Sequence, residues 1–347
     1  AMLAALAVFI RAPFFDVPMI NDEGGYAYVA HFWTDEYQLY RDIPFDRPQG
    51  IFLVYKVIFS LIGPDVESLR MAAAVYNAGT ALVLLVLARQ VFDPKTAWMC
   101  ALLFAIISVS PSIEGFTANA ELFASLPLTI AALMTWRKRW GWAGFFSGLA
   151  FLLKPIGLSG LILALAWALV VRASWRDSLR AVLAFSLGPL LMLVHGYLIG
   201  WHYFWYAVVE RKLSTDTAVS RDLLTQATRL IGSLASTSPA WLMLVALAAI
   251  AYPAWRTRAK SFAWLWVVSS VLGMAIGGHW SRHYYVQLVP ALALMAGPGA
   301  YRLLRSSRRL FSYRAVVAAL VIFGAIDLPL WFSAPEAVSE KVYDRPG

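Results

Sequence analysis

Residues 21–28 read NDEGGYAY and residues 40–50 read YRDIPFDRPQG, two polar and acidic segments that come soon after a first apolar run at residues 1–15. The chain beyond them is dominated by apolar residues. Functional residues gather disproportionately in the segments that connect the elements of a rigid scaffold. This polar stretch is therefore predicted to be the working surface of the protein, and the rest of the chain its support.

The composition predicts that this support lies in a lipid bilayer. Of 347 residues, 60% are hydrophobic and 14% are charged, whereas soluble domains are about 45–50% apolar and about 25% charged. The apolar runs, of roughly 16–24 residues, match the roughly 20 that a helix needs to cross the hydrocarbon core. The single cysteine, Cys100, excludes a disulfide within the chain. We therefore expect an all-α, polytopic membrane protein.

The net charge of +9 is distributed as a topology signal rather than as one basic patch. More than half of the Lys and Arg residues lie in short breaks between apolar runs, where only Asp93 and Asp177 accompany them. Because basic loops stay on the cytoplasmic side, these breaks predict about eleven spans and place most of the acidic residues at the outer face. Nucleic acid is not an expected partner.

The outer face is predicted to have two large loops, at residues 16–69 and 201–238. The first contains two aromatic-rich segments, residues 25–40 and 50–62, which are typical of helices lying in the interface plane. The turn at residues 112–121 is expected to be exposed. Residues 1–347 are expected to form one transmembrane domain without a soluble C-terminal domain. The spans are expected at residues 1–15, 71–87, 97–111, 122–136, 142–153, 156–171, 182–199, 241–254, 262–277, 284–300 and 315–331.

Asp22 and Glu23 place two carboxylates at the membrane surface, close to Tyr26. A carboxylate near apolar surface binds its proton more tightly, which suits a general base that takes a proton from an attacking hydroxyl. The other interpretation is an ordinary helix start, where acidic residues are favoured by the helix dipole. Asn119 and Glu121 stand where a later span begins, close to the bilayer edge, and a helix start with an acid favoured by the dipole is their ordinary interpretation.

Cationic residues form the second group of candidates. Lys154 lies in GLAFLLKPIGL, residues 148–158, and a lysine at the bilayer centre costs about 2.5–3.5 kcal/mol. It is therefore expected at a turn or a polar cavity, where an anionic lipid headgroup is a natural partner; the alternative is a snorkelling anchor. Arg47, beside Asp46, forms either a surface ion pair or a planar grip on phosphate.

His279, Arg282 and His283 lie in GGHWSRHYYVQLVP, residues 277–290. An interfacial turn explains the aromatic residues of this segment, but it does not require two histidines and an arginine. These three side chains are therefore candidate site residues as well.

In this order, the segments NDEGGYAY, YRDIPFDRPQG, ANAELF, GLAFLLKPIG and HYYVQLVP resemble the membrane glycosyltransferases of GT-C fold. The likeness is greatest to bacterial relatives of the protein O-mannosyltransferases and of the transferase that adds aminoarabinose to lipid A, and it covers residues 16–300. It implies a GT-C fold with about eleven transmembrane helices and interfacial helices in the first outer loop. It also implies a bacterial inner membrane, a cytoplasmic N-terminus, and an active site and C-terminus on the outer side.

The resemblance implies transfer of a hexose or pentose from a polyprenyl-phosphate carrier to a lipid, glycan or protein acceptor, with inversion. Asp22 is then the general base, and Glu23 a catalytic or supporting carboxylate. The residues implied to bind the donor phosphate are Lys154, Arg47, Arg282 and His283. Those implied to support the site or contact the acceptor are Glu121, Asn119, Tyr26, Asp46 and His279. Arg47 replaces the lysine that relatives have before proline.

No cofactor is required by this chemistry. Asp22 and Glu121 do offer oxygen ligands of the kind that Mg²⁺ or Mn²⁺ prefers, although nothing in the sequence demands a metal. Two other functions stay open. A lipid or solute transporter would use Lys154 as a midplane charge and is typically built from inverted repeats. A glycan ligase or polymerase of the O-antigen ligase type would use a polyprenyl-diphosphate donor and would not need Asp22 as base.

Overall fold

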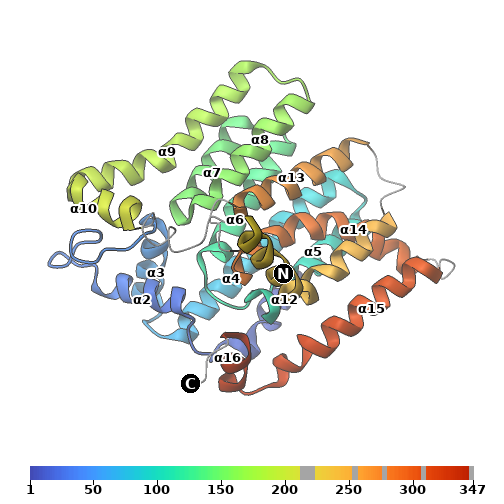
Figure 1. Ribbon diagram of the computed structural model, residues 1–347. Helices are drawn as coiled ribbons and strands as arrows, with labels where there is room; N and C mark the ends of the chain where they lie inside the picture. Colours follow the sequence, from blue (N-terminus) through green and yellow to red (C-terminus); the bar gives the residue numbers. More distant parts are fainter. Residues whose placement is uncertain (212–222, 252–256, 276–279, 306–309, 344–347) are drawn as a thin grey trace.

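The computed structural model describes residues 1–211, 223–251, 257–275, 280–305 and 310–343. Helices make up most of this part of the chain (Figure 1). Within it, β-type pairing is limited to an isolated bridge between Leu39 and Ile43. The prediction of an all-α protein is confirmed.

Helix follows helix along the described residues. The helices of the first half are α1 (Met2–Phe9), α2 (Asn21–Phe32), α3 (Gly50–Leu61), α4 (Val66–Val91), α5 (Pro94–Ile107), α6 (Ala120–Trp136), α7 (Trp140–Leu153) and α8 (Leu158–Val170). Those of the second half are α9 (Trp175–Ile199), α10 (Trp201–Trp205), α12 (Leu223–Ala251), α13 (Thr257–Ala275), α14 (Val289–Arg305), α15 (Leu310–Ile326) and α16 (Pro335–Tyr343). Short connecting helices are η1 (Ala12–Phe14), η2 (Pro111–Ile113), η3 (Pro155–Gly157), η4 (Tyr206–Glu210), η6 (Arg282–Leu288) and η7 (Leu328–Phe332).

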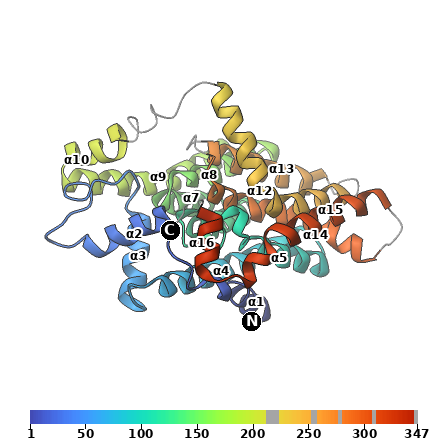
Figure 2. The ribbon, with the colours of Figure 1, turned by 60° about the horizontal axis from the view of Figure 1, so that its bottom comes forward.

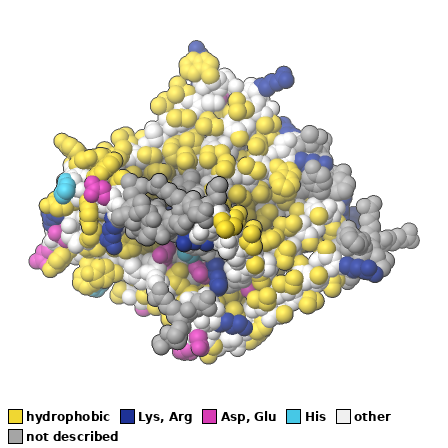
Figure 3. Space-filling view, viewed as in Figure 1, with side chains coloured by type: hydrophobic (Ala, Val, Ile, Leu, Met, Phe, Trp, Pro, Cys, Tyr) yellow, Lys and Arg dark blue, Asp and Glu magenta, His cyan; other side chains and the backbone are white. Residues whose placement is uncertain are grey.

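Over the residues that the structure describes, each expected span overlaps one or two helices, although the lengths differ. Among these residues, four segments are long and apolar enough to cross a membrane by themselves: Val66–Val91, Trp175–Ile199, Leu224–Ile250 and Arg314–Phe332. Other apolar helices, such as α5 and α7, are shorter than the roughly 20 residues of a full crossing. The face seen in Figure 3 is covered largely by hydrophobic side chains, as contact with lipid requires. The number of spans stays a prediction.

Two boundaries differ from the predicted ones. Helix α12 begins at Leu223, inside the stretch expected as the second outer loop. Helix α2 covers Asn21–Phe32 rather than residues 25–40. It begins early because the Glu23 side chain accepts a hydrogen bond of 3.1 Å from the Ile20 N–H, which satisfies one of the amide groups that a helix start leaves unpaired. The helix α3 lies where the second interfacial helix was expected.

Helices α7 and α9 pack side by side (Figure 1) through glycine residues. A Cβ atom on Gly144 would lie 2.0 Å from the Ala181 carbonyl oxygen, and one on Gly188 would lie 2.2 Å from the Gly148 carbonyl oxygen. Small residues at such positions let two backbones approach closely in a membrane, where packing rather than the hydrophobic effect drives association. This contact holds α9 against α7, the helix that Lys154 directly follows.

We expect Gly144→Ala to lower the free energy of unfolding by about 1–3 kcal/mol, because the added methyl group forces α9 away from α7. The control is Gly141→Ala on the same helix, since nothing lies within 4 Å of a Cβ atom there. Thermal unfolding of both variants in detergent checks this. Equal melting temperatures for Gly144→Ala and the wild type would show that the glycine contact contributes nothing.

The turn at residues 112–121 is buried, contrary to the prediction. Its backbone is held by side chains from distant elements: Arg11 donates to the Gly115 carbonyl at 2.7 Å, and the Tyr55 hydroxyl donates to the Ala118 carbonyl at 2.9 Å. The C-terminal helix α16 lies on this side of the bundle (Figure 2). There the Tyr343 hydroxyl donates to the Pro18 carbonyl at 3.1 Å. These contacts lie in the region where the first turns of α2 and α6 meet η6 and the end of α7.

Candidate active site

Three ionisable side chains from separate elements converge at this point. Asp22 comes from the first turn of α2, Glu121 from the first turn of α6, and His283 from η6. The His283 Nε2 atom lies 3.7 Å from Asp22 Oδ2 and 3.8 Å from Glu121 Oε1. Asp22 is 34% exposed, whereas Glu121 is completely buried. Of the two carboxylates, Asp22 is therefore the one that an incoming molecule can reach.

His283 lies between the carboxylates of Asp22, Glu121 and Glu114. Its Nδ1 atom lies 2.7 Å from Glu114 Oε2. Burial alone would favour the neutral ring, but the charge of Glu121 and the hydrogen bond to Glu114 outweigh it and raise the pKa of His283 above its ordinary value. When protonated, the ring can donate from both nitrogens. Its nitrogens lie near the carboxylates of Asp22, Glu114 and Glu121, and binding of the donor phosphate by His283 stays a prediction.

Lys154 directly follows α7, and its ammonium group is buried with a carboxylate and an aromatic ring. It donates to Glu121 Oε1, and it lies over the ring of Tyr284 at 4.2 Å from the centroid. The other carboxylate oxygen, Glu121 Oε2, has no hydrogen-bond partner within the described ranges. A buried ion pair needs further hydrogen bonds to offset the loss of water. Glu121 therefore has unused acceptor capacity at the site.

A cavity of ≈150 Å³ opens beside Lys154. The polar residues among its lining are Asp46, Arg47, Lys154 and Tyr284. The apolar lining residues are Pro48, Phe151, Pro155, Ile156, Met192 and Val208. Of the four residues predicted to bind phosphate, Lys154 and Arg47 therefore share one cavity, although they are far apart in the sequence.

Two contacts hold Arg47 at this cavity, one through its side chain and one through its backbone carbonyl. Its Nη1 atom lies 2.6 Å from Asp46 Oδ2, and its carbonyl oxygen accepts a hydrogen bond of 3.0 Å from the Tyr40 hydroxyl. Tyr26 is buried nearby, and burial together with the negative charge of Asp22 raises the pKa of Tyr26 well above its ordinary value. Tyr26 is therefore a neutral phenol beside the Arg47 guanidinium.

Known proteins share this architecture. Residues 46–201 match the family model of the dolichyl-phosphate-mannose-protein mannosyltransferases. The structure is similar to that of ArnT from Cupriavidus metallidurans bound to undecaprenyl phosphate, with a TM-score of 0.60, 16% identity, and coverage of 99% of this chain and 74% of that one. The chain has the GT-C fold.

The GT-C fold of this chain is also similar to that of the oligosaccharyltransferase of Archaeoglobus fulgidus. The TM-score is 0.55 and the identity 16%, over 97% of this chain and 56% of that one. No curated protein sequence matches the chain. The predicted resemblance to the GT-C membrane glycosyltransferases is confirmed at the level of fold.

Glu23 of this GT-C protein lies in a buried ion pair. It is completely buried, and Arg70 from α4 donates to both of its oxygens, one of them at 3.0 Å. The backbone N–H groups of Ile20 and Ala118 donate to the same carboxylate. Because its oxygens are occupied and covered, Glu23 is placed to support α2 rather than to contact a substrate.

Sequence reasoning missed Arg70, Glu114 and Arg11. Arg70 and Arg11 are each 1% exposed and lie in apolar surroundings. A charged residue inside an apolar run of a membrane protein indicates a function or a buried partner; this signal is present for Arg11, whereas Arg70 follows the polar residues Asp65, Glu67 and Ser68. Glu114 has no such signal in the sequence, because it stands in a predicted turn. In the structure its backbone is left-handed, with φ of 51°.

The remaining candidates lie in different surroundings. Arg282 donates to the Val342 carbonyl at 3.1 Å and so holds α16; it is not among the residues that line the cavity. Asn119 precedes α6, and both polar atoms of its side chain are buried without a partner among the described residues. His279 lies outside the described residues. In the part of the chain that the structure describes, no three His, Cys, Asp or Glu side chains are grouped to hold a metal.

Proposed function

We propose that this protein transfers a sugar from a polyprenyl-phosphate carrier to an acceptor hydroxyl at the outer face of a bacterial inner membrane, as an inverting hexosyl- or pentosyltransferase. The observation that carries the proposal is the cavity in which Lys154 and Arg47 stand beside an apolar lining. A phosphate joined to a hydrocarbon chain matches both parts of this lining. The similarity to ArnT, whose structure holds undecaprenyl phosphate, supports the same ligand class.

The leaving group of this reaction is the carrier phosphate, so negative charge builds up on it as the sugar departs. Fixed cations placed where that charge develops stabilise the transition state. The Arg47 guanidinium offers two parallel donors that match phosphate oxygens. The Lys154 ammonium adds a point charge and keeps Glu121 as its second partner. Donor binding therefore requires the phosphate to share Lys154 with Glu121.

Asp22 is the proposed general base. Its carboxylate takes the proton of the acceptor hydroxyl while the acceptor oxygen bonds to the anomeric carbon and the bond from that carbon to the phosphate oxygen breaks. The products are the glycosylated acceptor and the free polyprenyl phosphate, and the configuration inverts. His283, 3.7 Å from Asp22, orients this carboxylate. Asn119, Tyr26 and Glu121 are proposed to support the site from buried positions.

We expect Lys154→Ala to weaken the binding of undecaprenyl phosphate by about tenfold to a hundredfold, the usual value of a hydrogen bond to a charged group. Binding of labelled lipid to the protein in nanodiscs measures this. The matched control is Lys56→Ala, since Lys56 also lies over an aromatic ring, that of Trp33 at 5.3 Å, but outside the cavity.

Removal of Lys154 leaves Glu121 as an unpaired buried charge, so a second variant separates binding from folding. In Lys154→Met with Glu121→Gln, both charges are removed and the pair is replaced by neutral groups of similar size. Lipid binding of this double variant is expected to be as weak as that of Lys154→Ala. Wild-type affinity in both variants would reject the phosphate role.

Transfer itself is tested with the purified full chain, labelled prenyl-phosphate sugars and a mixture of lipid, glycan and peptide acceptors. Formation of a glycosylated product supports the proposal. Movement of the labelled lipid or sugar across vesicles without any product would favour a transporter. Product formed only from diphosphate-linked donors would favour a ligase or polymerase.

A further inference from the structure

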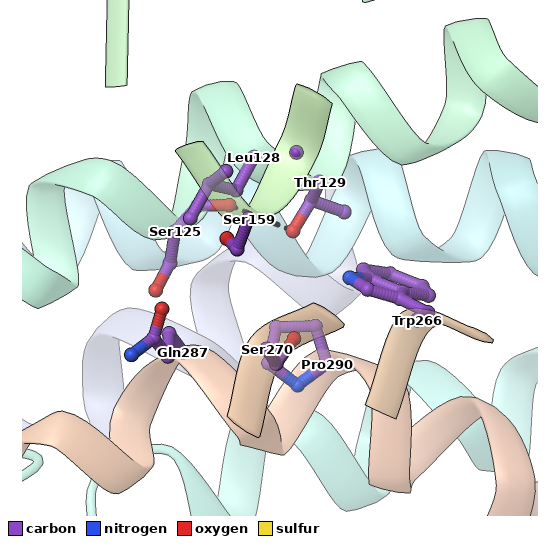
Figure 4. A pocket seen from close by; sticks show the side chains of 9 residues that line it. Ser125, Leu128, Thr129, Ser159, Trp266, Ser270, Gln287 and Pro290 are labelled. Carbon is purple, nitrogen blue, oxygen red and sulfur yellow. Dashed lines mark hydrogen bonds between the residues drawn. The ribbon is translucent and has the colours of Figure 1, made fainter. Parts of the chain in front are cut away.

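A second, much smaller cavity lies inside the helix bundle and is distinct from the one beside Lys154. Its volume is ≈10 Å³. Its lining comes from α6, the start of α8, α13 and the junction of η6 with α14 (Figure 4). The lining residues are Ser125, Leu128, Thr129, Ser159, Gly160, Trp266, Ser270, Gln287 and Pro290. A cavity with this many hydroxyl groups is unusual for the interior of an apolar bundle.

Gln287 lines this cavity with a buried amide group that lacks hydrogen-bond partners among the described residues. It is 3% exposed, and neither its amide nitrogen nor its amide oxygen has a hydrogen-bond partner within the described residues. Figure 4 shows it pointing toward Ser125. The Ser125 hydroxyl donates to the Glu121 carbonyl at 2.8 Å, so its lone pairs remain available as acceptors. Buried amide groups are almost always paired with protein or with ordered water.

We propose that this cavity binds one ordered water molecule that joins Gln287 to Ser125 and to the hydroxyls of Ser159 and Ser270. The volume of ≈10 Å³ is about that needed for a single water centre, and a buried water requires about two to four polar partners. The cavity supplies them from three helices and the η6 segment. A larger ligand does not fit this volume.

The water lies between the two elements that build the active site. Ser125 comes one turn after Glu121 on α6, and Gln287 comes just over one turn after His283 on η6. The segment η6 is a 3₁₀-helix, whose hydrogen bonds have poorer geometry than those of an α-helix, and Pro290 beyond it has no N–H to donate. The water therefore ties the weaker element to α6, and Gln287 is a positioning residue for His283.

The bridge is tested first on the protein without donor or acceptor, by a double-mutant cycle on the melting temperature. Gln287→Met removes the amide at similar volume, and Ser125→Ala removes one hydroxyl. If one water joins the two side chains, the second change lowers the melting temperature much less when the first is already present. Fully additive shifts would overturn the proposal.

The control cycle pairs Gln287→Met with Ser269→Ala. Ser269 is as buried as Ser270 and lies on the same helix, but its hydroxyl bonds to carbonyl oxygens of its own helix and it does not line the cavity. The shifts of this pair are expected to add. A high-resolution map of the full chain in nanodiscs is expected to contain a peak within hydrogen-bond distance of the Gln287 amide, which disappears in Gln287→Met. No peak there, in a map that resolves other buried waters, would also overturn the proposal.

The consequence for catalysis rests on the proposed function. Because the proposed role of His283 is to orient Asp22, Gln287→Met is expected to lower kcat by about tenfold to a hundredfold, as small displacements of reacting groups do, with the donor KM unchanged. A change in KM alone would contradict the positioning role. The cycle and the map need no substrate, so their failure counts against the water, whereas absence of transfer by the wild type counts against the proposed function.

Discussion

Asp22→Asn is expected to lower the rate of sugar transfer by about 10²–10⁴-fold, the usual contribution of a general base. Asparagine has the same shape as aspartate but cannot accept the proton of the acceptor hydroxyl. Donor binding is expected to stay within a few-fold of the wild type, because the cations at the cavity, Lys154 and Arg47, are unchanged. The loss should therefore appear in kcat rather than in the donor KM.

The measurement is single-turnover transfer from a labelled prenyl-phosphate sugar, with lipid binding measured in parallel. Asp16→Asn is the control, because Asp16 is an exposed acid that lies just before α2. It is expected to transfer at the wild-type rate. Full retention of transfer by Asp22→Asn would remove Asp22 from the role of base and would bring the ligase-type mechanism forward.

Glu23→Gln is expected to lower the free energy of unfolding by about 3–5 kcal/mol, because it leaves Arg70 as a buried charge without its partner. Arg70 is 1% exposed and also donates to the carbonyl groups of Val17 and Pro18, at 3.3 Å. The change also leaves one side-chain oxygen in place of the two that accept from the Ile20 and Ala118 N–H groups. Denaturant unfolding in mixed micelles measures the difference.

An exposed ion pair on the same protein provides the comparison. Arg180, whose side chain is 68% exposed, pairs with Asp177 at 3.0 Å, and Arg180→Gln is expected to change stability by only about 0–1 kcal/mol. In Glu23→Gln with Arg70→Met, both charges are absent, so the double variant is expected to be more stable than the sum of the two single changes. Equal losses for Glu23→Gln and Arg180→Gln would show that the buried pair contributes no more than a surface pair.

Asp22 and Glu23 show how much of the site could be predicted from the sequence. Asp22 and Glu23 are neighbours in the sequence and were assigned to one functional pair. Successive residues of a helix point about 100° apart, so the first turn of α2 directs Asp22 toward His283 and Glu23 toward Arg70. The sequence predicted that acids at this position matter. Which one reaches the accessible side depended on the helix start, which was predicted too late in the chain.

The cations were predicted with more success. Lys154 was singled out because a lysine in an apolar run is costly unless it has a polar partner, and it lies at the cavity together with Arg47. Arg70 has no such signal, because Asp65, Glu67 and Ser68 come shortly before it. Arg282 was grouped with His283 because the two are adjacent, yet it holds α16. Adjacency along the chain did not predict a shared role.

The sequence by itself predicted a lipid environment, the helical class and the segments that meet at the site. It could do so because hydrophobic runs and basic breaks follow directly from the free energy of placing each residue in lipid or water. Only the tertiary structure decided which charges are partners. Lys154 with Glu121, Arg70 with Glu23 and His283 with Glu114 each join residues distant in sequence. Such pairs form because a charge taken out of water requires an opposite charge beside it, and helix packing decides which one is within reach.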